Sequence, residues 1–441
     1  MANSYLNRTI SSSPTNPDKF TISMWVKKAG QGAEQVLLGS YASSNFRAKL
    51  QFKSDDKLEY YQVNDGGATA QVRTTRLFRD SNAFYHLVVQ FDTSQNTASD
   101  RIKIYINNVQ ETAFDISSYP AQDLDMRLNQ ASQTLSIGQD GNSGNYFNGY
   151  ISHLALADGQ TYAPTVFGET DSTSGIWKFK SPTGVTWGDD GFHLKFENSA
   201  NLGLDSANTN NFTVNGNLKQ ALDTPSNVYT TLNPLTIGAT AVTLGNGNNS
   251  IVGGAANAEW YTASTIAPSK GKWYLEIRND FASGQSADMI VGFTTNLVDV
   301  RNEAFPGKSS HSLGLWSAGT DVGDIKINNS VVSNQYTGDW GSANKILGMA
   351  LDLDNKIVYF SIDGVWQSSG NPSSGTGGYD FSSSLTPFED NYFIAIGSYY
   401  NSLTINKCSV NFGNGLFGTT AITSAGSNGN GSLFEYDCPT G

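Results

Sequence analysis

The chain has 441 residues, more than one ordinary domain holds, so we expect two or three domains. Only 15% of the residues are charged, and 39 acidic residues against 27 basic ones give a net charge of −12. With no stripe of Lys or Arg to offset it, this charge excludes binding to nucleic-acid phosphates and disfavours an anionic membrane surface.

Alternation of apolar and polar residues predicts β-strands throughout residues 1–165. Phe20, Ile22, Met24 and Val26 share one strand face, and a second strand presents Leu87, Val89 and Phe91 in the same way. Further strands are expected at residues 49–63 around a turn at 54–57, and at 101–108, 134–139 and 150–157. No window shows convincing helical spacing, and short turns of helix are expected only near residues 118–132 and 161–169.

Residues 166–235 are rich in Gly, Asn, Ser and Asp, yet they also carry large apolar side chains. These apolar anchors predict an ordered connector that packs on the first sandwich, not a flexible linker. The anchors are Trp177, Trp187, Phe192, Leu194 and Phe196.

Strand patterns resume in residues 236–420, and residues 421–441 are expected to form a loop or a mobile tail. Strands every ten residues or so, broken by polar turns, are typical of β-sandwiches. Two cysteines, Cys408 and Cys438, do not make a disulfide framework. They either form one disulfide or remain thiols, and we favour free thiols. The N-terminus lacks the apolar run of a secretory signal, and no window approaches the ~20 apolar residues of a membrane span.

The first part resembles the laminin-G-like, concanavalin-type jelly roll over about residues 15–165. The resemblance rests on the patterns FTISMWVK, FYHLVVQFD and RIKIYINN, and above all on Gly138 followed by FNGYI and an alternating strand. It implies a sandwich that binds ligands through loops at its edge. It also implies calcium at such rims in some members.

The second part resembles a SPRY (B30.2-like) domain over about residues 240–415. The matching patterns, in order, are GKWYLE, VGF, LGLW, GMALDLD and VYFSIDG. Together the two resemblances imply an all-β fold of two concanavalin-type jelly-roll β-sandwiches joined by the ordered connector. The domains would be 1–165, the connector 166–235, the SPRY-like sandwich 236–420 and the tail 421–441.

The whole arrangement is similar to virion structural proteins of marine tailed phages, whose joining segment resembles residues 168–184 and 191–214. The resemblance implies a surface-exposed virion protein, such as a fibre, a tail appendage or a capsid decoration. Such a protein would be made in the host cytoplasm without a signal and would be present in multiple copies or as a homo-oligomer. Its partners would be other virion proteins and a host cell-surface glycan or receptor.

The sequence offers no catalytic set, so we expect no enzyme and no cofactor. The four histidines lack HExxH or HxH spacing, and there is no GxSxG turn for a nucleophile and no phosphate-binding loop. Glycoside hydrolysis requires two carboxylates across one cleft. Asp352 and Asp354 alternate suitably, but we interpret them as turn residues of the strand.

Aromatic residues at strand ends are the candidate ligand contacts, because an exposed ring can stack on a sugar or anchor a protein partner. They are Tyr336, Trp340, Trp366, Tyr399 and Tyr400, whereas Trp273, Trp316 and Phe360 are expected in the core. Asp140, Asn142 and Asn145 form a second candidate group on a loop. Together with Asp55-Asp56 and Asp189-Asp190 they are the candidates for calcium, although such clusters are more often turns.

Three functions remain open. The first is a phage structural protein that adheres to the host surface, and the second is a depolymerase that cleaves host polysaccharide with paired carboxylates. The third is a purely architectural virion component without a host ligand.

Overall fold

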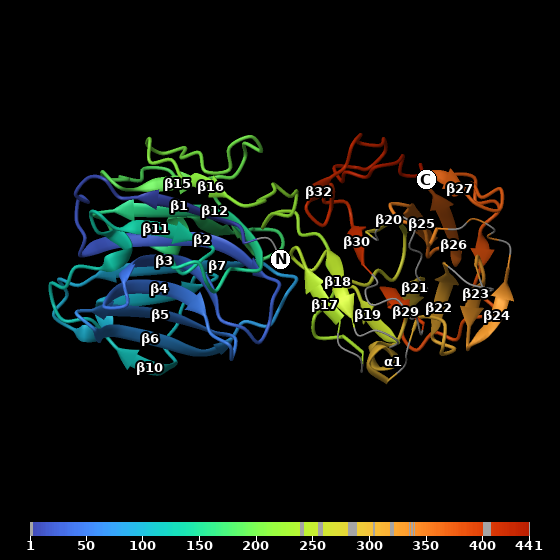
Figure 1. Cartoon of the computed structure of the whole chain (residues 1–441), viewed down its shortest axis with the longest axis horizontal. Helices are drawn as coiled ribbons and strands as arrows, with labels where there is room; N and C mark the ends of the chain where they lie inside the picture. The colour runs from blue at the N-terminus through green and yellow to red at the C-terminus, as the bar shows by residue number, and fades with distance from the viewer. Residues whose placement is uncertain are drawn as a thin grey trace. The chain divides into compact units, whose positions relative to one another are not determined.

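The computed structural model describes residues 3–238, 242–254, 259–280, 289–302, 305–317, 322–334, 336, 338, 340–399 and 407–440. It divides into two compact units, Met1–Val228 and Tyr229–Gly441, each built of antiparallel strands (Figure 1). The predicted all-β fold with two sandwiches is confirmed. The division falls inside the segment 166–235, most of which belongs to the first unit.

The first unit contains an eight-stranded and a six-stranded sheet. The larger sheet has the order β10 (Phe114–Ser118), β6 (Gly67–Leu77), β5 (Lys57–Asn64), β4 (Phe46–Phe52), β3 (Gln35–Ser43), β11 (Thr134–Ile137), β1 (Tyr5–Thr9) and β16 (Thr213–Asn215). The smaller sheet has the order β15 (Phe192–Leu194), β12 (Gly149–Asp158), β2 (Lys19–Lys28), β7 (Tyr85–Asp92), β8 (Ile102–Ile106) and β9 (Val109–Gln110). Short 3-10 helices lie at Ala98–Asp100, Arg127–Asn129 and Pro164–Val166, the last two in the regions expected to hold helical turns.

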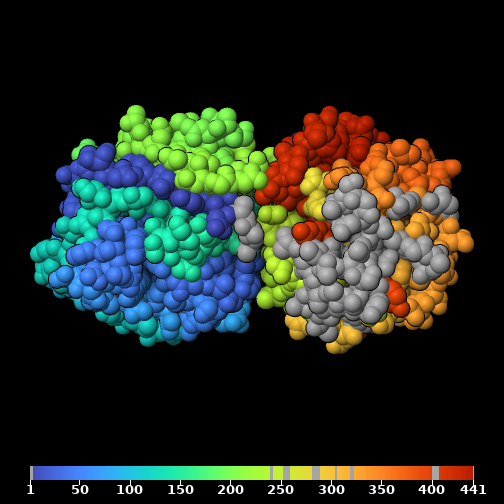
Figure 2. All heavy atoms as spheres, in the orientation of Figure 1, coloured from blue at the N-terminus to red at the C-terminus, as the bar shows by residue number. Residues whose placement is uncertain are grey.

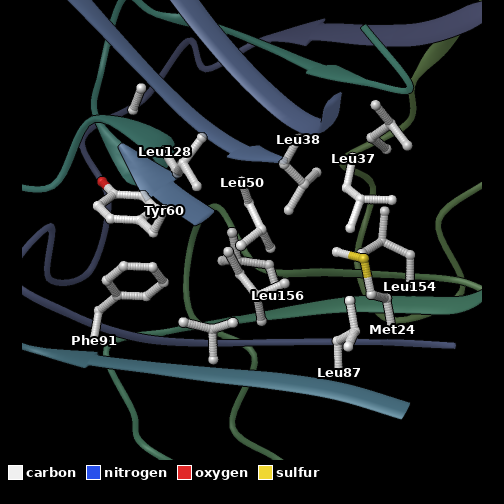
Figure 3. Packing of buried hydrophobic residues seen from close by; sticks show 14 of the residues in the cluster. Met24, Leu37, Leu38, Leu50, Tyr60, Leu87, Phe91, Leu128, Leu154 and Leu156 are labelled. Carbon is white, nitrogen blue, oxygen red and sulfur yellow. The ribbon is translucent and has the colours of Figure 1, made fainter. Parts of the chain in front are cut away.

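The core of the first unit lies between its two sheets. Met24 of β2, Leu87 of β7 and Leu154 of β12 point from the smaller sheet towards Leu38 and Leu50 of the larger one (Figure 3). All five side chains are buried. The predicted inward faces of these strands are therefore confirmed, since alternate residues of a strand point to one side of a sheet.

In the first unit, the outer face of the smaller sheet, which points away from the core, is covered by a hairpin. The hairpin of β13 (Gly168–Thr170) and β14 (Trp177–Phe179) places Trp177 over His86 and Phe179 over His153. The indole Nε1 of Trp177 donates to Nδ1 of His86 at 3.0 Å. Because an indole can only donate, His86 carries its proton on Nε2, which lies 2.9 Å from the Ser23 hydroxyl.

The first unit starts and ends on neighbouring strands. Tyr5 of β1 pairs with Asn215 of β16, so the segment after residue 200 lies beside the N-terminal residues. In the space-filling view, light-green spheres of that segment adjoin the dark-blue spheres of the N-terminal residues (Figure 2).

The second unit repeats this organisation with another eight-stranded and another six-stranded sheet. The larger sheet has the order β17 (Val242–Gly245), β18 (Ser250–Gly254), β30 (Cys408–Asn411), β20 (Lys272–Asn279), β25 (Ile346–Asp352), β26 (Ile357–Ile362) and β27 (Val365–Trp366), with β28 (Tyr379–Asp380) also paired to β26. The smaller one has the order β19 (Trp260–Ala263), β29 (Phe393–Ser398), β21 (Met289–Thr294), β22 (Ser312–Trp316), β23 (Ile325–Ile327) and β24 (Ser330–Ser333). A small hairpin, β31 (Leu416–Phe417) and β32 (Thr420–Ala421), and one six-residue helix, α1 (Leu297–Asn302), complete the described elements.

The C-terminal segment packs on the outer face of the larger sheet in the second unit. The carboxylate of Glu276 accepts hydrogen bonds from the backbone N–H groups of Glu435 and Tyr436 at 2.8 and 2.9 Å. Phe434 is buried, with its ring 4.8 Å from that of Tyr274. Within the predicted C-terminal tail, a buried acid on β20 therefore holds the backbone of Glu435 and Tyr436 against the sheet.

Candidate functional site

One tryptophan of the second unit presents its ring to solvent in a fixed orientation. Trp273, the second residue of β20, is 50% exposed, and its Nε1 donates to the carbonyl of Lys270 at 2.8 Å. Its expected place in the core is wrong, because the core cluster takes up Leu275 and Ile277 but does not reach the beginning of the strand. Trp316 and Phe360, by contrast, are buried as expected.

Polar groups lie next to this ring at the β25–β26 turn. The carboxylate of Asp354 accepts the backbone N–H of Gly271 at 2.9 Å, and Gly271 adjoins the indole nitrogen. Asp354 and Asn355 are both exposed. We call residues 270–273 and 352–356 together the Trp273 rim.

Hydrogen bonds hold the turn of the Trp273 rim in place. Asp352 is buried and accepts two hydrogen bonds from Asn355, one from the backbone N–H at 3.0 Å and one from the side-chain amide at 2.9 Å. The Nζ of Lys356 lies 3.1 Å from the Tyr392 hydroxyl and 3.2 Å from the Asp390 carboxylate. Burial disfavours the lysine charge, but these two partners outweigh it and raise the pKa of Lys356.

The arrangement suits binding more than bond cleavage. A rigid, half-exposed indole offers an apolar face, and Asp354 and Asn355 offer hydrogen-bonding groups beside it. The two carboxylates of the rim, Asp352 and Asp354, are both engaged in holding backbone or side-chain N–H groups of the turn and of Gly271. Sequence reasoning missed Trp273, and the signal that could have found it is its position at the very start of a strand.

Two predicted aromatic contacts are wrong, because they lie in the core. Tyr336 and Trp340 are 2% and 1% exposed and belong to the main apolar cluster of the second unit. The ring of Tyr336 packs edge-on at 5.4 Å from Phe360. Their polar neighbours in sequence made them look exposed, but both rings are buried.

The other predicted aromatics do not converge on one site. Trp366 is half-buried, 6.2 Å from the ring of Tyr274. Tyr399 is 42% exposed and leans on Phe305 and Trp316, with ring centroids 5.4 and 5.2 Å away. Tyr400 lies outside the described residues.

The predicted group Asp140, Asn142 and Asn145 is brought together, but as the frame of its own loop. Asp140 is buried, and it accepts the backbone N–H groups of Asn142 and Gly144 at 2.8 and 3.0 Å and the side-chain amide of Asn145 at 3.1 Å. Lys49 lies 3.6 Å from the same carboxylate. These bonds occupy the oxygens that a ligand would need.

Two of the other loop acids named for calcium also have protein partners. Asp56 pairs with Lys28 at 2.6 Å and Asp190 with Arg8 at 3.0 Å. Within the described ranges, no group of three or more His, Cys, Asp or Glu residues has a metal-binding arrangement. In the same part of the chain, no helix has the length and apolarity needed to cross a membrane.

Comparison with known families matches the first part of the chain. The family model described as "Concanavalin A-like lectin/glucanases superfamily", of the laminin-G type, matches residues 3–166. The expected laminin-G-like resemblance of the first part is thereby confirmed. A search of curated proteins finds no match.

Solved structures with similar folds share little sequence with this chain. The SPRY domain of human HERC1 is 10% identical, with 41% of this chain and 96% of that domain covered and a TM-score of 0.30. Domain 4 of AbnA, a GH43 extracellular arabinanase from Geobacillus stearothermophilus in complex with arabinotriose, is 16% identical (34% and 64% covered, TM-score 0.26). The enzymatically active domain of tailspike protein 2 of bacteriophage CBA120 is 12% identical (35% and 24% covered, TM-score 0.26).

Proposed function

We propose that this chain is a non-enzymatic adhesion protein of a phage particle that binds host-surface glycans through the Trp273 rim. The observation that carries the glycan part is the half-exposed Trp273 ring, held rigid by its bond to Lys270. A flat apolar ring beside exposed hydrogen-bonding groups complements a sugar, which has one apolar face and a polar edge. The lectin and glucanase superfamily match of residues 3–166 supports the same ligand class.

The particle part of the proposal rests on the sequence. A low content of charged residues and the resemblance to tailed-phage virion proteins support it. Several copies on one particle would turn weak contacts at single rims into strong attachment, because linked sites bind with a high effective concentration. Mass spectrometry of purified virions checks this part, and particles without the chain would contradict it.

The glycan part is tested with the full chain and a panel of host-surface polysaccharides, using isothermal titration calorimetry on any that bind. Trp273→Ala should weaken binding at least about tenfold, as for an aromatic contact at the centre of an interface. Trp273→Phe should retain part of the affinity. Tyr399→Ala is the matched control, because Tyr399 is also an exposed aromatic but lies at the opposite end of β29 from the rim. The end of β29 near the rim is marked by Tyr392, which precedes the first residue of the strand.

Three outcomes would overturn the assignment. Equal binding by Trp273→Ala and the unaltered chain would remove the rim from the proposal, and a blank panel would favour the architectural alternative. Release of reducing sugar from a polysaccharide, abolished by alanine at Asp352 or Asp354, would establish the depolymerase instead.

A further inference from the structure

A cavity of about 440 Å³ opens at one edge of the first unit. It lies between β1 and β11 of the larger sheet and β12 of the smaller one. Its position follows from the strand pairing. Within the described part of the chain, the short strand β15 pairs with Leu154–Leu156 of β12 and leaves the preceding residues 149–153 without a partner strand on that side, and these residues line the cavity. The volume is within the range of small-molecule sites, about 300–1,000 Å³.

The inner wall of the cavity is the core itself. Leu6 and Ile137 of the core cluster line it, and the half-buried Phe147 and Ile151 pack against that cluster. The buried Leu202 adds to the apolar lining. An apolar wall of this kind favours contact with the apolar part of a ligand. The interior therefore favours a hydrocarbon body over a sugar.

The outer lip of the cavity is polar. Glu197, Lys219 and Gln220 line it and are exposed, and Lys195 is half-buried. Lys195 and Glu197 are 4.0 Å apart, and the Asp223 carboxylate on the cavity wall is already paired with Lys27. Because Lys27 neutralises Asp223, the lip carries the two ammonium groups of Lys195 and Lys219 and only one further carboxylate, that of Glu197. This is a local excess of positive charge in a chain of net charge −12.

The segment 218–224 covers the cavity. Two hydrogen bonds hold this cover in place, so it does not fold into the cavity and fill it. The side-chain amide of Gln220 donates to the carbonyl of Phe196 at 2.7 Å. Asp223, three residues further on, accepts from Lys27 at 2.6 Å.

We infer that this cavity binds a small amphiphile, with a single alkyl chain between the two sheets and an anionic head group at Lys195 and Lys219. The apolar wall selects the chain, and the cationic excess at the lip selects the charge of the head. The site is in the first unit and is independent of the Trp273 rim. Failure of one proposal therefore leaves the other standing.

The test is calorimetric titration of the full chain with hexanoate, octanoate, decanoate and decanol. Each added methylene should tighten binding about fourfold, the equivalent of about 0.8 kcal/mol, so decanoate should bind roughly 200-fold tighter than hexanoate. Decanoate should also bind tighter than decanol. Absence of a chain-length effect would overturn the apolar site, and equal affinity for acid and alcohol would overturn the role of the head group.

Variants assign the binding to this cavity. Leu202→Trp should fill it and abolish decanoate binding, whereas Leu204→Trp, at a leucine that is 44% exposed and outside the lining, should not. Should Leu202→Trp fail to fold, Ala221→Phe in the cover makes the same test. Undiminished binding by the filled variant would overturn the inference.

A second pair of variants tests the head group. Lys219→Gln should weaken decanoate but not decanol. Lys103→Gln, a lysine of the same unit outside the lining, should change neither. Equal loss of acid and alcohol binding in Lys219→Gln would contradict recognition of the charge.

Discussion

The Nζ of Lys27 lies 2.6 Å from Oδ2 of Asp223, and neither side chain has any exposed surface. The pair joins β2 to a segment 196 residues further along the chain. Burial lowers the pKa of Lys27, while the charge and hydrogen bond of Asp223 raise it. The ring of Tyr150 lies 5.2 Å from the ammonium and shares the same enclosure.

We predict that Lys27→Met destabilises the first unit strongly, by about 3–5 kcal/mol, because it leaves the Asp223 carboxylate buried without its cation. The double variant Lys27→Met with Asp223→Leu should be much milder, since no lone charge remains. Urea unfolding monitored by hydrogen exchange in β2 measures both. Lys19→Met is the control: Lys19 is paired with Asp92 but is one-third exposed, so the loss should stay below about 1 kcal/mol.

The buried histidine beneath Trp177 predicts acid sensitivity. Burial lowers the pKa of His86 to about 3, against an ordinary 6.5. Above pH 6.5 the ring is neutral in the folded and unfolded states alike. Below it only the unfolded state binds a proton, so the free energy of unfolding falls by up to about 1.4 kcal/mol per pH unit until about pH 3.

Burial also lowers the pKa values of His153 and His193, in each case to about 4, so three rings contribute to this slope. His86→Gln should make the fall of the unfolding free energy between pH 6 and pH 4 shallower, because one of the three contributing histidines is removed. Urea midpoints measured across that range for the variant and the unaltered chain provide the measurement. Identical slopes would show that His86 titrates normally.

Replacing Glu276 of β20 should release the C-terminal segment locally from the sheet. Glu276→Gln replaces an anion that accepts two backbone N–H groups, and hydrogen bonds to a charged group are worth about 1.5–3 kcal/mol. The amides of Glu435 and Tyr436 should then exchange much faster with deuterium. The exposed Glu389→Gln should leave their exchange unchanged, and an equal effect of both variants would count against the anchor.

The two cysteines should differ in reactivity. Both are free, and burial raises the pKa of both thiols, with that of Cys438 raised to about 11. Cys438 is half-buried and Cys408 fully buried, so a thiol reagent at pH 8 should label Cys438 slowly and Cys408 only after unfolding. Glu276→Gln should speed the labelling of Cys438 alone. Prompt labelling of Cys408 in the native protein would contradict its buried position.

Sequence periodicity predicted which residues face the cores but not what covers the outer faces. Phe20, Ile22 and Met24 follow the alternation of β2 and are buried as expected. Trp25 and Lys27 on the opposite face are buried too, although the alternation assigns that face to solvent. Trp25 stacks on the His86 ring of the neighbouring strand, and Lys27 pairs with Asp223, which lies 196 residues further along the chain. No local pattern encodes the second contact.

The site residues were harder to predict than the strands, because exposure at a strand end depends on where the facing sheet stops. Tyr336 and Trp340 have polar neighbours and are buried, whereas Trp273 lies in a clear strand pattern and is exposed. The Asp140 loop shows a related limit. The sequence identifies its polar residues, but only the structure reveals that they bond to one another.

The pairing of Tyr5 with Asn215 places the first and last strands of the first unit side by side. A unit whose terminal strands are adjacent can be inserted into a surface loop of an unrelated host protein without stretching that loop, and it tolerates circular permutation. Recombination between genes can therefore move this unit as a whole. We expect the same unit to be joined to other domains in other proteins.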